Sequence, residues 1–320
     1  MILLLGIPTE SPLALVTAAL DDLDEPYILF NQRRAAEAGL ELSVHNGQVS
    51  GVFALNGQEY PLEAFGGIYN RMMDGRSLPE VRDLPLEHPD RVHCRRLHDT
   101  LLQWMEICPA RVINPMAAMA SNGSKPYQMQ LIRQHGFSIP ETLITNDPEL
   151  VREFYRQHRQ VIYKSASGVR SIVSPLRPED FERLERIRWC PTMFQKQVMG
   201  ENLRVHVIGE KVFATRIQTN AVDYRYARRW DSHPELQAVE IDAELAQRCI
   251  ALACSLGLAF AGIDLMLTDE SVSRSGDDNG IDNGGRIYCF EVNPNPGFSY
   301  FEAHTGQPIA QAVADYLTGG

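Results

Sequence analysis

The sequence predicts a mixed α/β protein with a small N-terminal α/β lobe followed by two further regions. The chain has 320 residues, which suits two or three packed lobes rather than one core. Short apolar or alternating runs typical of strands are interleaved with segments of helical period. Turn dipeptides containing Gly, Pro and Asn separate these runs. Hydrophobic residues make up 44% and charged residues 22%, as in an ordinary soluble globular enzyme.

The overall charge excludes one class of partner. A net charge of −11 argues against a nucleic-acid partner, which needs a basic face. The opening run Met1–Leu5 has no basic flank and is too short to span a bilayer, so we expect a strand, no membrane partner and a cytoplasmic location. The six cysteines form no CxxC pair, and most of them sit in apolar surroundings, which indicates small buried side chains in a reducing compartment. They are Cys94, Cys108, Cys190, Cys249, Cys254 and Cys289.

Residues 1–112 are expected to form the α/β lobe. Asn46-Gly47 and Asn56-Gly57 predict two tight hairpin turns between short strands. A strand that starts at Gly67 delivers Arg71 to a loop. The other expected elements are strands over Ile2–Leu5 and Tyr27–Phe30, a helix from Ser11 to about Leu20, and a helix over Arg91–Met105.

Residues 113–190 form the second expected region. Lys125 begins a helix whose buried stripe includes Tyr127 and Leu131 and which ends at Gly136. A second helix follows Asp147-Pro148. Val161–Lys164 is a strand that runs into a loop of small residues.

Residues 191–320 form the third expected region. Two alternating strands meet at Gly209-Glu210, and a plain two-residue hairpin pairs Arg204 with Thr215. The remaining elements are a helix over Leu245–Leu256, buried strands over Ala261–Leu267 and Tyr288–Val292 joined by a long polar loop, and a closing helix over Gln307–Leu317.

Three oxygen-bearing side chains on the last two strands predict a metal site. Glu291 and Asn293 are two residues apart, so they project from the same face of one strand. Asp264 interrupts the buried strand before it, and a buried charge needs a cation or a metal as partner. Carboxylate and amide oxygens suit Mg²⁺. The alternative is a pair of salt bridges across the sheet.

Two lysines are candidates for binding phosphate. Lys164 precedes a loop of small residues, including Ser165 and Gly168, whose backbone N–H groups can approach phosphate oxygens. Lys125 begins a helix. Each lysine taken alone is also compatible with an ordinary surface cation. Arg170 in the same loop is either a solvated charge or an anion contact.

The segment Met193–Val198 crosses from the second region to the third. Its backbone is suited to hydrogen-bond the edge of a planar base, although a simple linker strand is the alternative. Arg204 and Arg216 interrupt the strands of the hairpin and are candidates for stabilising transferred charge. The two-residue hairpin places them on opposite faces, which favours Arg204. Arg225 follows in a loop, either as an anion contact or as a solvated charge.

The order of these parts resembles the ATP-grasp superfamily, and specifically the RimK-type carboxylate–amine ligases. The matching segments are Asn122–Lys125, Val161–Lys164 with its loop, Phe194-Gln195, Glu201–Gly209, Gly262–Asp264 and Phe290–Gly297. The stretches Cys190–Gln195, Lys211–Ala214 and Asp223–Arg225 look most similar to ligases that macrocyclise ribosomal peptides of the microviridin type.

The resemblance implies an ATP-grasp fold, in which two α+β subdomains clasp ATP. It implies ATP with one or two Mg²⁺ ions as cofactors. By this resemblance Lys125, Lys164, Ser165 and Gly168 hold the phosphates, and Arg204, Arg216 and Arg225 are catalytic. Gln195, Lys196, Gln197, Val198 and Asn202 hold the adenosine, and Asp264, Glu291 and Asn293 hold the metal. Lys196 stands where many members have Glu.

The implied reaction activates a carboxylate as an acyl phosphate and joins it to an amine, releasing ADP. The carboxylate belongs to a peptide, a protein or a small molecule, and Arg71, Arg170 and Arg225 are candidate anchors for it. A ligase of free amino acids and a non-catalytic nucleotide-binding module are the alternatives. The sequence leaves the substrates and a homodimer open.

Overall fold

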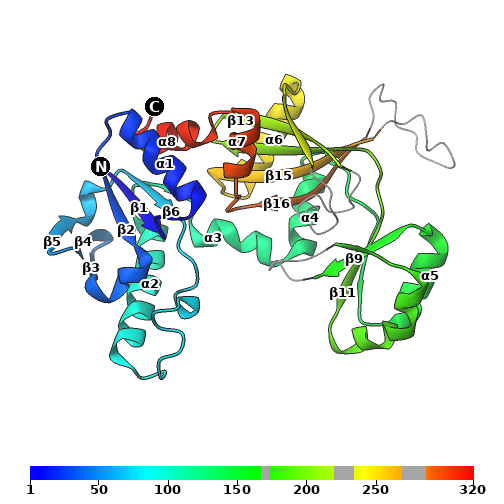
Figure 1. Cartoon of the computed structure of the whole chain (residues 1–320), viewed down its shortest axis with the longest axis horizontal. Coiled ribbons are helices and arrows are strands. Elements are labelled where there is room, and N and C mark those ends of the chain that lie inside the picture. Colours follow the sequence, from blue (N-terminus) through cyan, green and yellow to red (C-terminus); the bar gives the residue numbers. More distant parts are fainter. Residues whose placement is uncertain (167–172, 220–233, 269–285) are drawn as a thin grey trace.

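The computed structural model describes residues 1–166, 173–219, 234–268 and 286–320, which form four sheets and the helices around them (Figure 1). The first lobe lies at one end of the view and the small lobe containing helix α5 (Pro148–His158) at the other. The largest sheet lies between them and toward the top. Among the described helices, none is both long and apolar enough to cross a membrane.

A parallel sheet forms the centre of the first lobe. Its strands, in spatial order, are β2 (Tyr27–Asn31), β1 (Ile2–Gly6), β6 (Gly67–Asn70) and β7 (Arg111–Ile113). Side chains alternate along β1, so Leu4 enters one core cluster and Leu3 and Leu5 enter another. Helix α1 (Ser11–Asp22) packs on the first cluster and α2 (Pro89–Ile107) on the second. The leucine run at the start of the chain is therefore a strand buried on both faces.

A smaller sheet of two hairpins extends this lobe. It contains β3 (Gly39–His45), β4 (Gln48–Leu55) and β5 (Gln58–Pro61). Both turns have positive φ at their two central residues, 53° at Asn46 and 80° at Gly47, and 53° at Asn56 and 78° at Gly57. Asn and Gly tolerate this geometry, which matches the twist of a two-residue hairpin. The two predicted hairpin turns are confirmed.

The small lobe has an antiparallel sheet. Its strands, in spatial order, are β10 (Ser174–Pro175), β9 (Val161–Ser165), β11 (Thr192–Lys196) and β8 (Thr142–Thr145). Helix α5 and a 3₁₀ stretch over Pro178–Trp189 cover one face. Val151, Leu184 and Phe194 are buried in the core between them. The other face carries Lys164 and Gln195, two of the residues predicted to bind nucleotide.

The large sheet has five antiparallel strands. In spatial order they are β14 (Glu235–Val239), β13 (Lys211–Gln218), β12 (Glu201–Ile208), β15 (Phe260–Leu267) and β16 (Ile287–Asn293). Helix α6 (Ala243–Ser255) covers one face. Helix α4 (Lys125–Gln134), which follows the short α3 (Met116–Met119), packs against the edge strand β16.

The C-terminal helices join the large sheet to the first lobe. They are α7 (Ser299–Thr305) and α8 (Ile309–Thr318). Val313 and Leu317 of α8 share one core cluster with Leu13 of α1 and Phe260 of β15. The division of the chain after residues 112 and 190 stays a prediction. Strand β11 lies in the small sheet, although it follows the second of these boundaries.

Candidate active site

The register of the large sheet brings the predicted oxygen ligands together. Asp264 of β15 lies opposite Glu291 of β16, and Asn293 lies opposite Gly262. Cross-strand partners in an antiparallel pair project from the same face. The adjacency predicted from the period-two pattern is therefore present, and a shift in register after Asp264 separates these pairs from the rest of the ladder.

The face that carries these oxygens is apolar at one end of β12 and polar at the other. Arg204 and His206 lie on it, because Arg204 pairs with Asp264 and residues two apart share a face. Toward Ile208 this face is apolar and is covered by Phe298 and Phe301. Toward Arg204 it carries carboxylates instead. The candidate site begins where the cover from the C-terminal helices ends.

Each carboxylate is paired with a buried cation. The Nη1 atom of Arg204 lies 2.8 Å from Oδ1 of Asp264, and Nζ of Lys125 lies 3.5 Å from Oε1 of Glu291. The side chains of Arg204 and Lys125 are only 5% and 7% exposed, and those of the acids 18% and 16%. Buried charges need such compensation. The acids therefore form the salt bridges of the alternative hypothesis, and both remain partly exposed to solvent.

The oxygen donors of these side chains fit Mg²⁺, and they leave part of the coordination shell of the ion for phosphate oxygens or water. Among the described residues no three His, Cys, Asp or Glu side chains form a metal cluster. The site instead offers two carboxylates and the amide oxygen of Asn293, which accepts one hydrogen bond from the N–H of Asn295 at 3.1 Å. Mg²⁺ is commonly held by one or two carboxylates together with phosphate oxygens and water. The residues present fit such an ion.

His206 is a site residue that the sequence analysis missed. Its ring is fully buried, it packs edge-on against Phe301, and its Nε2 accepts a hydrogen bond from Nε of Arg204 at 3.5 Å. Desolvation, and then the charge of Arg204, lowers the pKa of His206 well below its usual value. The imidazole is therefore neutral, and its Nδ1 is buried without a hydrogen-bond partner among the described residues. Its position two residues after Arg204 was the available signal.

Helix α4 presents a different face from the one predicted. Tyr127, expected in the buried stripe, is 53% exposed, and this expectation is wrong. The buried side chains are Lys125, Gln128 and Ile132, with Leu131 partly buried. Two of these are polar, so an apolar periodicity could not identify them. The buried face of α4 points its polar half at β16.

Two predicted nucleotide-binding residues lie on one face of the small sheet. Phe194 and Tyr163 pack into the core beneath α5, so by alternation Lys164 and Gln195 project from the opposite face. Lys164 is 7% exposed and Gln195 is 2% exposed. Gln195 donates to Oγ1 of Thr142 at 3.0 Å, while its own Oε1 is buried without a hydrogen-bond partner among the described residues. In Figure 1, α5 lies on the side of β9 and β11 away from β16.

The backbone of the crossing segment is already hydrogen-bonded in part. The N–H of Lys196 donates to Glu141 and that of Gln197 donates to Gln160, both at 2.9 Å. The Lys196 side chain is 51% exposed, with its Nζ 3.7 Å from Glu141. Val198 is half-buried. The nucleotide contacts of this segment stay a prediction.

The other predicted site residues are distributed as follows. Asn202 is two residues before Arg204 and shares its face. Arg216 pairs with Leu203 on the opposite face, where its Nε donates to Glu201 at 2.5 Å, as the two-residue hairpin predicts. Ser165 is exposed at the end of β9. Gly168, Arg170 and Arg225 lie outside the described residues, and their roles stay predictions.

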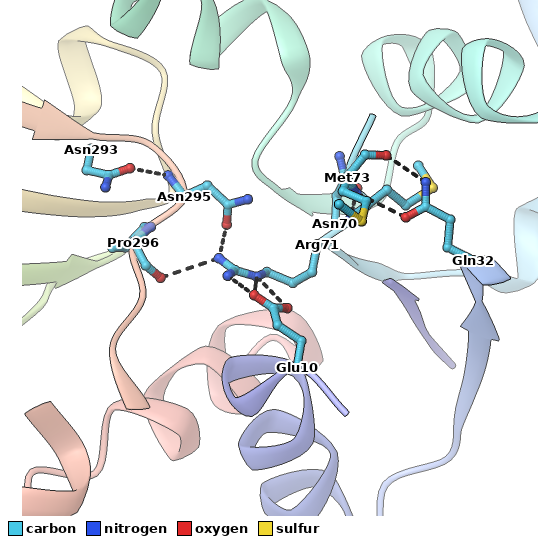
Figure 2. Close-up of polar contacts among 9 residues, drawn as sticks. Glu10, Gln32, Asn70, Arg71, Met73, Asn293, Asn295 and Pro296 are labelled. Carbon is cyan, nitrogen blue, oxygen red and sulfur yellow. Dashed lines mark hydrogen bonds and ion pairs between the residues drawn. The ribbon is translucent and has the colours of Figure 1, made fainter. Parts of the chain in front are cut away.

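Arg71 joins the first lobe to the turn after the metal ligands. Figure 2 shows its guanidinium between the carboxylate of Glu10 and the turn formed by Asn295 and Pro296. It forms an ion pair with Glu10, donates to Oδ1 of Asn295, and lies 3.3 Å from the carbonyl oxygen of Pro296. The Arg71 side chain is 8% exposed. The guanidinium of Arg71 is therefore already bound by residues of the chain itself. The structure gives no support to Arg71 as a substrate anchor.

Comparison with known proteins identifies similar sequences. Residues 122–317 match the family model described as the RimK-like ATP-grasp domain. A probable alpha-L-glutamate ligase of Photobacterium profundum is 23% identical over 229 residues, which are 68% of this chain and 70% of that protein. Human N-acetylaspartylglutamate synthase A is 25% identical over 233 residues, which are 68% of this chain and 54% of that protein.

Solved structures resemble the whole chain. The macrocyclase MdnC of Microcystis aeruginosa, bound with precursor peptide MdnA, has a TM-score of 0.79 at 22% identity and covers 100% of this chain and 99% of its own. The ATP-grasp ligase PsnB, complexed with a phosphomimetic variant of its minimal precursor, Mg and ADP, has a TM-score of 0.75 at 26% identity, covering 99% and 97%. D-alanine–D-alanine ligase of Bacillus anthracis shares the fold at a TM-score of 0.57.

Proposed function

The chain belongs to the RimK-like ATP-grasp family, and we propose that it is an ATP- and Mg²⁺-dependent ligase that joins a carboxylate to an amine and releases ADP. The fold is an ATP-grasp fold, with the small sheet and the large sheet as its two clasping parts. The proposed location is the cytoplasm. One observation supports the proposal: two buried cations, Arg204 and Lys125, pair with two of the three oxygen ligands at the large sheet. A third buried cation, Lys164, projects from the face of the small sheet away from α5.

Phosphoryl transfer needs positioning and charge neutralisation more than a protein nucleophile. Lys164 from the small sheet and Lys125 from α4 supply the positive charge that a triphosphate requires. Asp264, Glu291 and Asn293 would hold one or two Mg²⁺ ions, which supply further neutralisation of the phosphate oxygens when bound. Arg204 is proposed to stabilise the transferred phosphoryl group, because it shares the face of these ligands. Arg216 has its partner on the other face.

The reaction is proposed to run in two steps. A carboxylate oxygen of the substrate attacks the γ-phosphorus, the bond to the β-phosphate oxygen breaks, and ADP leaves. The acyl phosphate is then attacked by an amine, the bond between carbonyl carbon and phosphate oxygen breaks, and inorganic phosphate and an amide are formed. The amine loses one proton to solvent or to phosphate. No cysteine is required, and the Cys289 thiol has a pKa raised by burial.

The internal ion pairs suggest how the site accommodates nucleotide. Arg204 and Lys125 are held by Asp264 and Glu291 at 2.8 and 3.5 Å. Each pair keeps a buried cation compensated before nucleotide binds. With nucleotide bound, Arg204 and Lys125 would pair with phosphate oxygens, and Asp264 and Glu291 would hold the metal. Each charged group would then keep a partner of opposite charge.

A peptide is the proposed carboxylate substrate. The structures that cover nearly the whole chain include macrocyclases and ligases complexed with precursor peptides, and one of them is 26% identical. A free amino acid is the second candidate, because relatives of similar sequence are named alpha-L-glutamate ligases. An ester formed by a hydroxyl group, in place of an amide, is compatible with the same acyl phosphate.

The test is ADP release from ATP and Mg²⁺ across acidic peptides and free amino acids, each with and without an added amine. We expect release that depends on one carboxylate class, and loss of at least 100-fold in Asp264→Asn and in Glu291→Gln. Asp315→Asn is the matched control, since it breaks a remote surface pair with Lys211 at 2.6 Å. Normal ATP binding without release on any substrate would favour a non-catalytic module.

A further inference from the structure

Gln128 makes two reciprocal hydrogen bonds with the backbone of a single residue. Its Nε2 donates to the carbonyl oxygen of Val292 at 2.8 Å, and its Oε1 accepts from the N–H of Val292 at 2.9 Å. Gln128 is 3% exposed and Val292 is fully buried. The side-chain amide therefore pairs with the strand as a further strand would.

The place of this contact is specific. Val292 lies between Glu291 and Asn293, two of the proposed metal ligands, and its cross-strand neighbour is Ile263. Strand β16 is the last strand in the order of its sheet within the described part of the chain. The edge of a sheet leaves N–H and C=O groups unpaired, and burying them without partners is costly. Gln128 hydrogen-bonds the backbone N–H and C=O of this edge strand at the residue between the two proposed ligands.

The same contact fixes the helix that carries Lys125. Residues three apart on a helix lie on one face, so Lys125 is one turn away from Gln128 along the same side of α4. Two bonds to one backbone residue set both the height and the rotation of α4 relative to β16. That register leaves Nζ of Lys125 at 3.5 Å from Oε1 of Glu291.

We propose that Gln128 is a positioning residue that holds the metal-ligand strand and the phosphate-binding Lys125 in register. The proposal rests on the proposed function, since it concerns the ligands of that same site. Gln128 acts through Val292 and Lys125 and touches neither metal nor nucleotide. Groups that orient metal ligands from behind contribute 10- to 100-fold to metal affinity or activity.

The test compares Gln128→Met with wild type. Methionine has a similar length and no amide, so Val292 loses both partners. The first readout is Mn²⁺ binding, by calorimetry, to protein saturated with a non-hydrolysable ATP analogue. We expect affinity to fall about 10- to 100-fold. The second readout is hydrogen exchange of the Val292 amide, which we expect to become faster.

Gln32→Met is the matched control. Gln32 is 2% exposed and makes the same reciprocal pair with the backbone of Met73, at 2.6 and 3.0 Å. The substitution removes the same two bonds in the first lobe, so a comparable loss of Tm is expected. Mn²⁺ affinity is expected to stay within about twofold of wild type. An equal loss of Mn²⁺ affinity in both variants would mean general destabilisation and would overturn the positioning role.

A second variant covers failure of Gln128→Met to fold. Gln128→Glu keeps an acceptor for the Val292 N–H and loses the donor, so an intermediate loss of Mn²⁺ affinity is expected. Mn²⁺ affinity unchanged in both Gln128 variants contradicts the positioning role and leaves the proposed function intact. A wild-type protein that binds nucleotide but no Mn²⁺ contradicts the proposed metal site itself.

Discussion

Gly262 leaves the space in which the Arg204 side chain lies. A Cβ atom at position 262 would overlap the guanidinium of Arg204 and contact Pro296. Gly262→Ala is therefore expected to displace Arg204 from Asp264 while leaving both charges in place. A misplacement of about 1 Å in an active site can lower the rate about 100-fold, and we expect a loss of that order in kcat. Steady-state kinetics with the preferred substrate measure it.

A second glycine near the same turn provides the control. A Cβ atom at Gly297 would meet no atom within 4 Å. Gly297→Ala is therefore expected to leave kcat within about twofold of wild type. If Gly262→Ala were as active as Gly297→Ala, then Arg204 would have no role that depends on its position.

His206 gives the folded protein a distinct sensitivity to acid. The folded-state pKa of His206 is lowered well below that of the unfolded chain, which is about 6.5. Above about pH 6.5 both states hold the ring neutral, so His206 adds no pH dependence. Below it only the unfolded chain takes up the proton. The free energy of unfolding then falls by up to about 1.4 kcal/mol per pH unit until the folded-state pKa is reached.

Urea unfolding at pH 7.5 and pH 5.5 measures this loss of stability. His206→Leu removes the titrating group, and the difference in unfolding free energy between the two pH values is expected to shrink by about 1 kcal/mol. All other groups titrate alike in both proteins, so they cancel in the comparison. An unchanged pH difference in His206→Leu would mean that the pKa of His206 is the same in the folded protein as in the unfolded chain.

At the scale of single elements, the strands were predictable and the contacts of α4 were not. Period-two alternation placed Asp264 beside Glu291 and Asn293, and hairpin geometry paired Arg204 with Thr215. These patterns are local. The contact of Gln128 with β16 spans 164 residues and depends on an edge strand that no periodicity reveals. The spacing of apolar residues cannot predict a buried helix face when that face carries polar side chains.

The small sheet carries a prediction of its own. Lys164 lies on the face opposite the core beneath α5 and is proposed to bind phosphate. Lys164→Met keeps the length of the side chain and removes its charge, so we expect about 10-fold weaker ATP binding. Lys211→Met, at an exposed lysine 52% accessible and remote from the sheet face, is the control. Fluorescence of a labelled ATP analogue measures both, and equal affinities would return Lys164 to a structural role.

At the scale of the molecule, the first lobe and the large sheet are joined by one core. Helix α8 is the last element of the chain, yet its buried side chains share a cluster with β1 and α1 at the start. Asn114 adds polar contacts between these parts, with its Nδ2 2.6 Å from the carbonyl oxygens of both Phe260 and Pro294. Among the residues that the structure describes, the core of the small lobe is built from the range 143–194. The first lobe with the large sheet forms one body and the small lobe forms a second, and we expect these two bodies to unfold separately.

Leu317→Ala and Leu184→Ala separate the two bodies experimentally. Both leucines are buried, at 1% and 3% exposure, so each truncation is expected to cost about 2–5 kcal/mol through lost burial and a residual cavity. Leu317→Ala should speed hydrogen exchange in β1 and β12 together, because both strands contribute to the cluster around α8. Leu184→Ala should speed exchange in β9 and β11 and leave β1 unchanged. Exchange in β1 that responded equally to both truncations would mean that the two lobes unfold as one unit.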